Sequence, residues 1–443
     1  MSIGIFVTIC IFLVGMLLAI PLGWLFVATT GIGLSVDGIP DNFVIGTFYA
    51  SLNSYVLMSI GFFIFAGSLI SAGGLADKIV DFSHALVGKI RGGMTLVAII
   101  STVFMSALTG SSVPCVSALV PILVPRLHKL GYQKEYTTAV LCSASFLGYL
   151  IPPSVPALIY CLVAQQSVAA VFLSTVIPAI LLAVGYAVLN YFIAPKYIDK
   201  VGDSEPEEFL GFHDRWMKFK SVTWKALPAL GCPLVILVGI YGGICTPNEA
   251  GAIAVVYSIV VGFFVYKHLN KERFSSALLE TTVSIGLIAL LIASGSIISR
   301  YLVRAGAAQS LADHMLSLFE SPEMILLSLN GFLLLLGMFI EAIPILILTV
   351  PLVLPLMVEL DVNLVHLGAI FIINIGLGVI TPPFAMSLFV GTRLSGTAYQ
   401  KVAPIMLKYL FYVGIPVLML TTYIPSLSTW LPTMMLGSKV VGQ

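Results

Sequence analysis

The sequence predicts an all-α polytopic membrane protein, built on an inverted-topology repeat with two re-entrant helical hairpins and two broken transmembrane helices. Three observations predict this fold. Of the 443 residues, 59% are hydrophobic and only 9% are charged, against about 25% charged residues in an average soluble domain. Long runs without any charge divide the chain, and a set of prolines recurs at a fixed spacing. Together these features indicate membrane helices arranged in two related units.

The composition excludes several classes of protein. A soluble enzyme must cover a large surface with polar groups, and a chain with 9% charged residues has too few. A disordered chain would be far less hydrophobic. Twenty-one Lys and Arg residues balance 20 Asp and Glu residues, so no positive field is available to bind nucleic acid. The six cysteines and six histidines are scattered without metal-site spacing, and we interpret the cysteines as small buried hydrophobic residues.

Charge-free runs locate the membrane segments. A spanning helix needs about 20 apolar residues, so the runs hold roughly ten to twelve such segments. They lack the alternation of polar and apolar residues that is expected of outer-membrane β-strands. The first run also lacks the basic start and cleavage site of a secretory signal, so we expect it to be a retained helix. The runs are 1–36, 42–76, 94–125, 136–195, 226–248, 250–266, 281–299, 324–340, 342–358 and 409–438.

An internal repeat organises the chain. Gly148 has a matching Gly378, 230 positions later. Five prolines recur at the same spacing, which is hard to obtain by chance among 24 prolines. They are Pro114, Pro121, Pro125, Pro152 and Pro153, matched by Pro344, Pro351, Pro355, Pro382 and Pro383.

The repeat divides the chain into five regions. We expect an N-terminal scaffold helix at 1–40, a first repeat unit at 41–165, scaffold helices with a cytoplasmic loop (196–225) at 166–274, a second repeat unit at 275–400, and a C-terminal helix and tail at 401–443.

Each unit contains a re-entrant hairpin. In the first unit, the segment at about 93–126 divides at Gly110–Val113 into two pieces, each too short to cross a membrane comfortably. Pro114 suits the first turn of the second piece. The second hairpin is expected at about 324–357, with its tip at Ile340–Ile343.

A broken helix follows each hairpin. The span 136–163 contains Pro152-Pro153, and the span 364–392 contains Pro382-Pro383. Two successive prolines unwind a helix because each removes a backbone donor. Unwound backbone at membrane depth is tolerated where it lines a protein cavity, and paired interruptions in two halves indicate a transporter binding site. The alternative is a simple kink at each proline pair.

The charges beside the hairpins predict opposite insertion. Lys89 and Arg126 flank the first hairpin, whereas Glu323 and Glu359 flank the second. Basic flanks mark the cytoplasmic side, so the two units enter from opposite faces, as in an inverted repeat. Counting the crossings places the N-terminus in the cytoplasm and the C-terminus outside.

Two further segments precede the hairpins, at about 75–90 and 307–319. Both are amphipathic, so we interpret them as interfacial helices, with plain connecting helices as the alternative. Thr246-Pro247-Asn248-Glu249 has the pattern of a helix capping box, which gives Glu249 a structural role.

Four stretches resemble those of a known family: Leu108–Ser112, Gly148–Ser154, Tyr241–Ala250 and Gly376–Pro383. With the repeat, they resemble the large membrane subunit of TRAP (tripartite ATP-independent periplasmic) transporters over nearly the whole chain. The resemblance implies an elevator-type, ion-transporter-like fold in the inner membrane, with a periplasmic C-terminus. It implies sodium-coupled import of an organic acid anion, a carboxylate or sulfonate, without catalysis. It also implies a periplasmic substrate-binding protein and a small membrane subunit of about four helices as partners.

The resemblance also implies at least two sodium ions. One would lie between the first hairpin and the first broken helix, and the second at the matching place in the other unit. Unwound backbone supplies the oxygen ligands that a hard cation prefers. The implied residues are Ser106, Gly148, Ile151 and Pro153 for the first ion, and Gly337, Gly378, Thr381 and Phe384 for the second.

The anionic substrate is expected at the hairpin tips. Helix N-termini there offer free N–H groups and positive dipole, to which Gly110, Ser111, Ser112 and Ser154 would add hydroxyl donors and room to turn. The resemblance implies that Arg304 engages the substrate carboxylate. Glu341 is an intramembrane acid, and therefore a functional candidate. The family often has Asp at the position of Glu341. The family also usually has Glu after an Ala-Gly pair, and this chain has Ser68 there, after Ala66-Gly67.

Two alternatives remain open. A related inverted-repeat carrier could work alone as a sodium/anion symporter, without a binding protein. An intramembrane enzyme would need a catalytic pair within the spans, and the sequence contains none. A channel is disfavoured because closed hairpin tips suit occlusion better than conduction.

Overall fold

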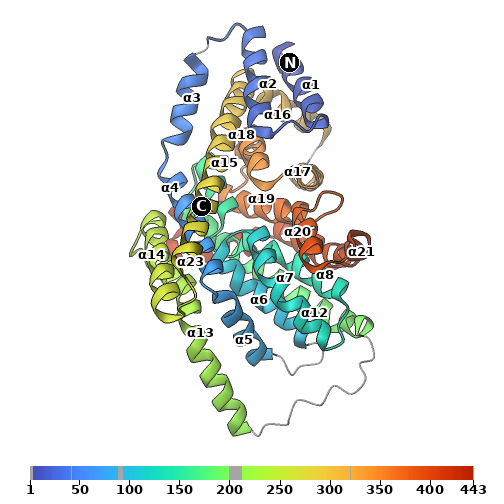
Figure 1. Ribbon diagram of the computed structural model, residues 1–443. Helices are drawn as coiled ribbons and strands as arrows, with labels where there is room; N and C mark the ends of the chain where they lie inside the picture. Colours follow the sequence, from blue (N-terminus) through green and yellow to red (C-terminus); the bar gives the residue numbers. More distant parts are fainter. Residues whose placement is uncertain (1–2, 41, 88–92, 199–211, 320, 443) are drawn as a thin grey trace.

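The computed structural model describes residues 3–40, 42–87, 93–198, 212–319 and 321–442. These residues form helices and connecting turns, without a β-strand among them (Figure 1). Eight helical segments in the described ranges are long and apolar enough to cross a membrane. This is fewer than the roughly ten to twelve expected from a length of about 20 residues per span. The difference arises because several apolar helices are short pieces of hairpins or broken spans.

The predicted repeat is confirmed helix by helix. α7 (Ser112–Lys129) and α18 (Ala342–Glu359) have the same length and begin 230 positions apart, and both proline pairs contain a cis peptide bond. The first unit comprises α4 (Tyr55–Ala72), α5 (Leu75–Val87), α6 (Gly93–Thr109), α7, α8 (Lys134–Ser145), α9 (Leu147–Leu150) and α10 (Val155–Ala164). The second comprises α15 (Lys271–Arg304), α16 (Ala307–Leu318), α17 (Pro322–Gly337), α18, α19 (Leu364–Val379) and α20 (Met386–Ser395).

Both hairpins and both broken helices lie where the sequence predicts them. Only two residues, Gly110 and Ser111, separate α6 from α7. The second tip begins earlier than predicted, because α17 ends at Gly337 and α18 starts at Ala342. Of the two amphipathic segments, α16 matches 307–319, and α5 covers 75–87, with 88–90 outside the described residues.

The N-terminal region differs from the prediction of one helix. α1 (Ile3–Leu17) and α2 (Leu22–Val36) are separate helices that pack on each other, and the stacked rings of Phe12 and Phe26 lie 5.7 Å apart. Pro21 disfavours helical backbone in the residue before it, which ends α1. α3 (Asn42–Leu52) then leads to the first unit.

The middle region also differs from the prediction. Part of the expected loop at 196–225, residues 199–211, lies outside the described residues. The remainder from Phe212 onward belongs to α13 (Phe212–Tyr241), which extends below the body of the protein in Figure 1. The capping box before α14 (Pro247–Val260) is confirmed: the Glu249 carboxylate accepts the Thr246 N–H at 2.7 Å, and the Glu249 N–H donates to the Thr246 hydroxyl.

The repeat continues beyond its predicted ends. α11 (Val168–Ser174) and α12 (Val176–Ile193) follow the first unit, as α21 (Tyr399–Tyr409) and α22 (Ile415–Tyr423) follow the second. The expected C-terminal tail is also helical. α23 (Ser426–Leu436) packs on α11 and α12, and α24 (Ser438–Val441) ends the described chain.

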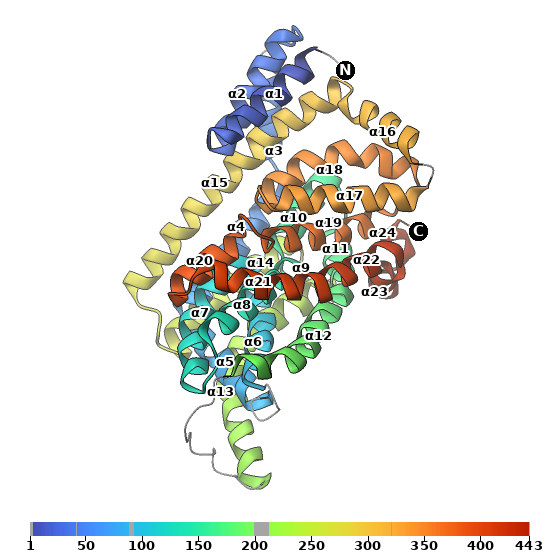
Figure 2. The same ribbon diagram turned by 90° about the vertical axis from the view of Figure 1, so that its right-hand side faces the viewer.

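The two units are interlocked. α7 of the first unit packs along α20 of the second, and α10 of the first packs along α18 of the second. In Figure 2, α7 and α20 end at the left, whereas the open end of the α17–α18 hairpin is at the right. The hairpins therefore enter the body from opposite sides, and each braces the broken helix of the other unit.

We predict that a bulky side chain at Gly391 weakens this interlock. A Cβ at Gly391 would lie 2.3 Å from the Cys142 sulfur, whereas one at Gly286 meets nothing within 4 Å. Overpacking of a core costs about 1–3 kcal/mol. Gly391→Leu should therefore lower the midpoint of thermal unfolding in detergent, measured by tryptophan fluorescence, whereas Gly286→Leu should leave it unchanged. Equal midpoints for Gly391→Leu and wild type would contradict the interlock.

Candidate functional site

The first interruption is a short unwound segment between α9 and α10. It contains Ile151, Pro152 and Pro153, and Ser154 caps the helix that follows. The Ser154 hydroxyl accepts the Ala157 N–H at 3.2 Å and donates to the Tyr149 carbonyl, so it bridges the two sides of the break. Ser154 therefore holds the break in shape.

The tip of the first hairpin closes on this break through backbone contacts. Gly110 has a φ of +61°, which glycine adopts without steric cost, and its ideal Cβ would lie 2.2 Å from the Pro153 carbonyl oxygen. The Val155 N–H donates to the Gly110 carbonyl at 3.3 Å. A Cβ at Gly148 would lie 2.9 Å from the Ser111 carbonyl oxygen. Both glycines are needed because the tip and the break are in direct backbone contact.

The structure thus brings the residues proposed for the first ion together around the tip. Gly148 and Pro153 touch it directly, and Ile151 lies between them in the chain. The Ser106 carbonyl accepts the Gly110 N–H at 2.9 Å, so Ser106 lies one helical turn below the tip.

At the second interruption the hairpin contacts the broken helix just before the break. Gly337, at the end of α17, lies against Gly378 of α19, and a Cβ on Gly337 would come within 2.7 Å of the Gly378 Cα. The Thr381 hydroxyl donates to the Leu377 carbonyl at 2.6 Å. Phe384 directs its side chain outward, with 59% of it exposed and its ring 5.7 Å from that of Phe339. Phe384 can therefore contribute only backbone atoms to a site between Gly337 and Gly378.

The donor set at both breaks fits a hard cation. In the part of the chain that the structure describes, no three His, Cys, Asp or Glu residues cluster as a metal site would need. The breaks instead offer backbone carbonyls, such as that of Pro153, and the hydroxyl of Thr381. Sodium takes such neutral oxygen ligands in unwound membrane helices.

The serines of the first tip differ in their surroundings. Ser112 is fully buried, and its hydroxyl lies 2.7 Å from that of Ser145 and 2.6 Å from that of Ser387. Ser112 therefore joins the two units, and its hydroxyl is already engaged. Ser111 is half-buried at the N-cap of α7 without a side-chain cap bond.

Sequence reasoning missed Ser145 and Ser387 as partners of Ser112. Their repeat positions are Ile375 and Ala157, so the repeat offered no signal for this contact. A second missed feature is a buried polar chain: the Asn374 amide donates to the Asn330 carbonyl oxygen at 2.6 Å, and the Asn330 amide donates to the Thr422 hydroxyl at 2.9 Å. Asparagine residues within the charge-free apolar runs were the sequence signal that could have predicted this chain of hydrogen bonds.

Glu341 and Arg304 are not brought together. Glu341 is exposed at the N-cap of α18, close enough to Tyr149 for an electrostatic interaction. α15 runs in the same direction as α18 (Figure 2). Gly295 packs on Ile347, and Leu348 and Leu352 pack against the cluster that contains Ile298, Tyr301 and Leu302. Arg304, nine residues beyond Gly295, therefore lies away from the tip.

The Arg304 guanidinium instead lies 5.7 Å from the centroid of the Phe43 ring in α3. A cation that lies above the face of an aromatic ring is attracted by the ring electrons. The contact of Arg304 with a substrate stays a prediction from the family resemblance.

We predict that a methyl group at Gly337 opens the second tip. The Cβ would meet backbone, which cannot move aside as a side chain does, whereas a Cβ at Gly331 in the same helix meets nothing within 4 Å. Gly337→Ala should therefore increase hydrogen–deuterium exchange in peptides covering the end of α17 and the start of α18. Gly331→Ala is the matched control. Unchanged exchange in Gly337→Ala would mean that the tip does not depend on this contact.

Comparisons with known proteins identify the family of this chain. The sequence matches the family described as "Tripartite ATP-independent periplasmic transporter, DctM component" over residues 9–427. The chain is 32% identical over 416 residues to the C4-dicarboxylate TRAP transporter large permease protein DctM of Vibrio cholerae, covering 89% of each chain. It is 31% identical over 415 residues to the isethionate TRAP transporter permease protein DctMQ of Oleidesulfovibrio alaskensis, covering 94% of this chain. It spans only 63% of the length of that relative.

The fold is also similar to a solved transporter structure. The crystal structure of the YdaH transporter of Alcanivorax borkumensis superimposes with a TM-score of 0.64 at 15% sequence identity, covering 94% of this chain and 99% of that one. This likeness concerns the fold alone. The relatives with higher identity are transporter permeases, so the chain is a secondary transporter and not an enzyme. It belongs to the DctM family, the large permease component of tripartite ATP-independent periplasmic (TRAP) transporters.

Proposed function

We propose that this chain imports an organic acid anion, driven by sodium, and receives the anion from a periplasmic binding protein. The observation that carries the proposal is the pair of interrupted helices, each contacted by its own hairpin through a glycine, at Gly110 in the first unit and at Gly337 in the second. Paired interruptions in two related halves are the arrangement expected of a transporter binding site.

Sodium would be held at both breaks. The first set consists of Ser106, Gly148, Ile151 and Pro153, and the second of Gly337, Gly378, Thr381 and Phe384. Each entering positive charge gains about 2.3 kcal/mol per 100 mV of membrane potential. Two sodium ions with a monoanion carry one net positive charge and gain this energy, whereas with a dianion the net charge is zero and the sodium concentration gradient alone would drive uptake.

The anion would lie at the first tip. The N-terminus of α7 offers the N–H groups of its first turn, and the positive end of the helix dipole favours a negative charge there. At the N-terminus of α18 the Glu341 carboxylate already supplies that charge. Ser111 is the hydroxyl best suited to bind the anion, whereas Ser112 and Ser154 hold the tip and the break in shape.

The substrate class follows from the relatives. The Vibrio relative is named for C4-dicarboxylates and the Oleidesulfovibrio relative for isethionate, which is a sulfonate. Both compounds are small organic anions with planar or tetrahedral oxyanion groups. We infer a carboxylate or sulfonate for this chain.

The family also implies partners: a small permease subunit and a periplasmic binding protein. We propose about four helices for the small subunit. The interlocked α7–α20 and α10–α18 pairs would move as one body against the remaining helices, an elevator mechanism. The basic ends of the first hairpin would face the cytoplasm, with the N-terminus cytoplasmic and the C-terminus periplasmic.

Uptake into liposomes tests the proposal. The full chain, reconstituted with its small subunit, should accumulate a radiolabelled carboxylate or sulfonate only with an inward sodium gradient and the cognate binding protein. Sodium-driven uptake without the binding protein would favour the stand-alone symporter. Uptake that does not depend on the sodium gradient would contradict the proposed coupling of substrate uptake to sodium.

We predict that Thr381→Ala weakens sodium activation. The substitution removes the one side-chain hydroxyl among the oxygen ligands proposed for the second site. A lost hydrogen-bonding or ligand oxygen costs about 1–3 kcal/mol, so the sodium concentration for half-maximal uptake should rise about tenfold. Thr381→Ser should stay near wild type, and Thr282→Ala, on the exposed face of α15, serves as control. An unchanged sodium dependence in Thr381→Ala would remove Thr381 from the site.

A further inference from the structure

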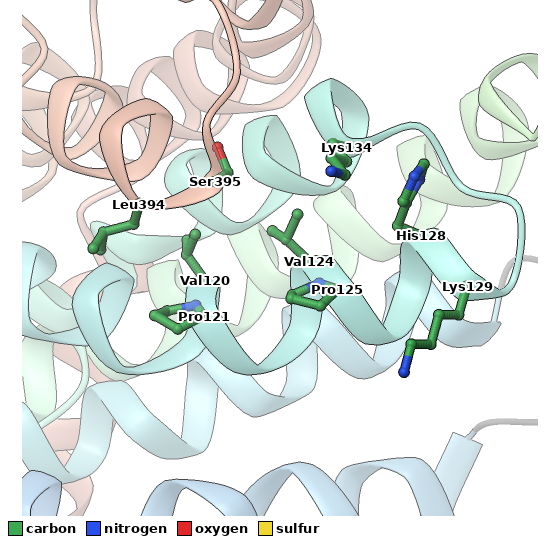
Figure 3. A pocket seen from close by; sticks show the side chains of 9 residues that line it. All are labelled: Val120, Pro121, Val124, Pro125, His128, Lys129, Lys134, Leu394 and Ser395. Atoms are coloured by element: carbon green, nitrogen blue, oxygen red, sulfur yellow. The ribbon is translucent and has the colours of Figure 1, made fainter.

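A small pocket lies at the far end of the first hairpin, distant in sequence from both tips. It is enclosed by the last turns of α7, the start of α8 and the end of α20, and has a volume of about 210 Å³ (Figure 3). Because α7 and α20 belong to different units, the pocket lies where the two interlocked units meet.

One half of the pocket is basic. His128, Lys129 and Lys134 line it, and the His128 Nδ1–H donates to the Tyr132 carbonyl at 3.2 Å. Figure 3 shows Lys134 and His128 on the side of α7 that faces Ser395, with Lys129 extending outward from the helix end.

These positive charges are not compensated by the protein. Within the described ranges, neither Lys129 nor Lys134 has an ion-pair partner. The neighbouring Arg126, by contrast, lies 3.2 Å from Asp77 and 3.1 Å from Asp81. The nearest acid in the chain, Glu135, lies 3.7 Å from Lys401 and is engaged there. Lys134 therefore brings an unpaired ammonium group to the pocket, and Lys129 carries a second one outward from its edge.

The other half of the pocket is apolar. Val120 and Val124 form its buried wall, and Pro121 and Pro125 of α7 lie exposed beside it. Leu394 of α20 covers the opposite side. A ligand that fills both halves must have an anionic group next to an apolar part.

We expect the pocket to lie near the depth of the lipid headgroups. A predicted membrane span begins at Lys134 and runs to Ala164, so Lys134 marks a membrane boundary. Clusters of Lys and Arg at such boundaries attract anionic lipids.

The volume limits which part of a lipid can enter. Sites for drug-sized ligands measure about 300–1,000 Å³, and this pocket is smaller. It can hold a phosphate with part of its glycerol, while the acyl chains lie outside along Pro121 and Pro125.

We propose that this pocket binds the phosphate group of an anionic phospholipid. The lipid would join α7 of the first unit to α20 of the second at their ends and so stabilise the interlocked body. Two lysines that merely extend toward water would bind phosphatidylglycerol no better than lysines at any other membrane boundary.

Native mass spectrometry of the purified full chain tests the proposal. The probes are phosphatidylglycerol and phosphatidylethanolamine with matched acyl chains, added to protein in a neutral detergent. Wild type should retain phosphatidylglycerol preferentially. Each lysine is worth about fivefold in binding, so Lys129→Gln with Lys134→Gln should weaken retention about 30-fold. The matched control replaces Lys267 and Lys271 with Gln, at a different basic boundary. Equal retention of the two lipids by wild type would overturn the proposal, as would an equal loss in both double variants.

A second experiment, with a water-soluble ligand, distinguishes a lipid site from a site for free phosphate. Phosphatidylglycerol should raise the thermal midpoint of wild type, and glycerol phosphate alone should not. A midpoint raised by glycerol phosphate but not by phosphatidylglycerol would overturn the lipid assignment. The double variant must elute as wild type does in size-exclusion chromatography, so that a loss of binding is not a loss of folding.

Discussion

The rest of the structure depends on one constraint: backbone groups inside a membrane must find hydrogen-bonding or ionic partners within the protein. This chain breaks two helices at proline pairs, where regular hydrogen bonding cannot continue. Each broken helix is approached by its hairpin backbone to backbone, at Gly110 and Gly148 in the first unit and at Gly337 and Gly378 in the second. At the first break Pro152, Pro153 and Ser154 are buried, so the carbonyls there are enclosed by protein, which is the condition for holding a cation. At the second break Pro383 and Phe384 are exposed, so this break is open on one side.

The interlock of the two units follows from the same arrangement. A hairpin that enters halfway must be supported along its length, and α7 and α18 each gain that support from the other unit's broken helix. Ser112 joins this contact with polar bonds to Ser145 and Ser387. The two proposed ion sites thus belong to one body. In the proposed mechanism, a movement that opens one tip would strain the packing that supports the other, which would couple the two ions to the anion.

Much of the fold could be predicted because the repeat is visible in the sequence itself, as prolines at a fixed spacing. Pro114 and Pro344 open matching helices, and the proline pairs mark both breaks to the residue. The contacts between units could not be predicted, because Ser112 meets Ser387 across 275 positions with no matching pair in the repeat. The division of α1 from α2 was missed because charge-free length alone does not reveal a turn at Pro21. The position of Arg304 over Phe43 could not be predicted either, because tertiary packing sets the direction of α15 relative to α18.

Equilibrium binding of radioactive sodium to the purified chain tests the central proposal most directly. The account predicts two sodium ions per wild-type chain. Gly110→Ala, which forces a Cβ into the Pro153 carbonyl, should lose one ion and retain the other, because the second break keeps its own tip. A chain that binds no sodium, or a Gly110→Ala variant that still binds two ions with unchanged affinity, would contradict the proposal that the interrupted helices hold the coupling ions.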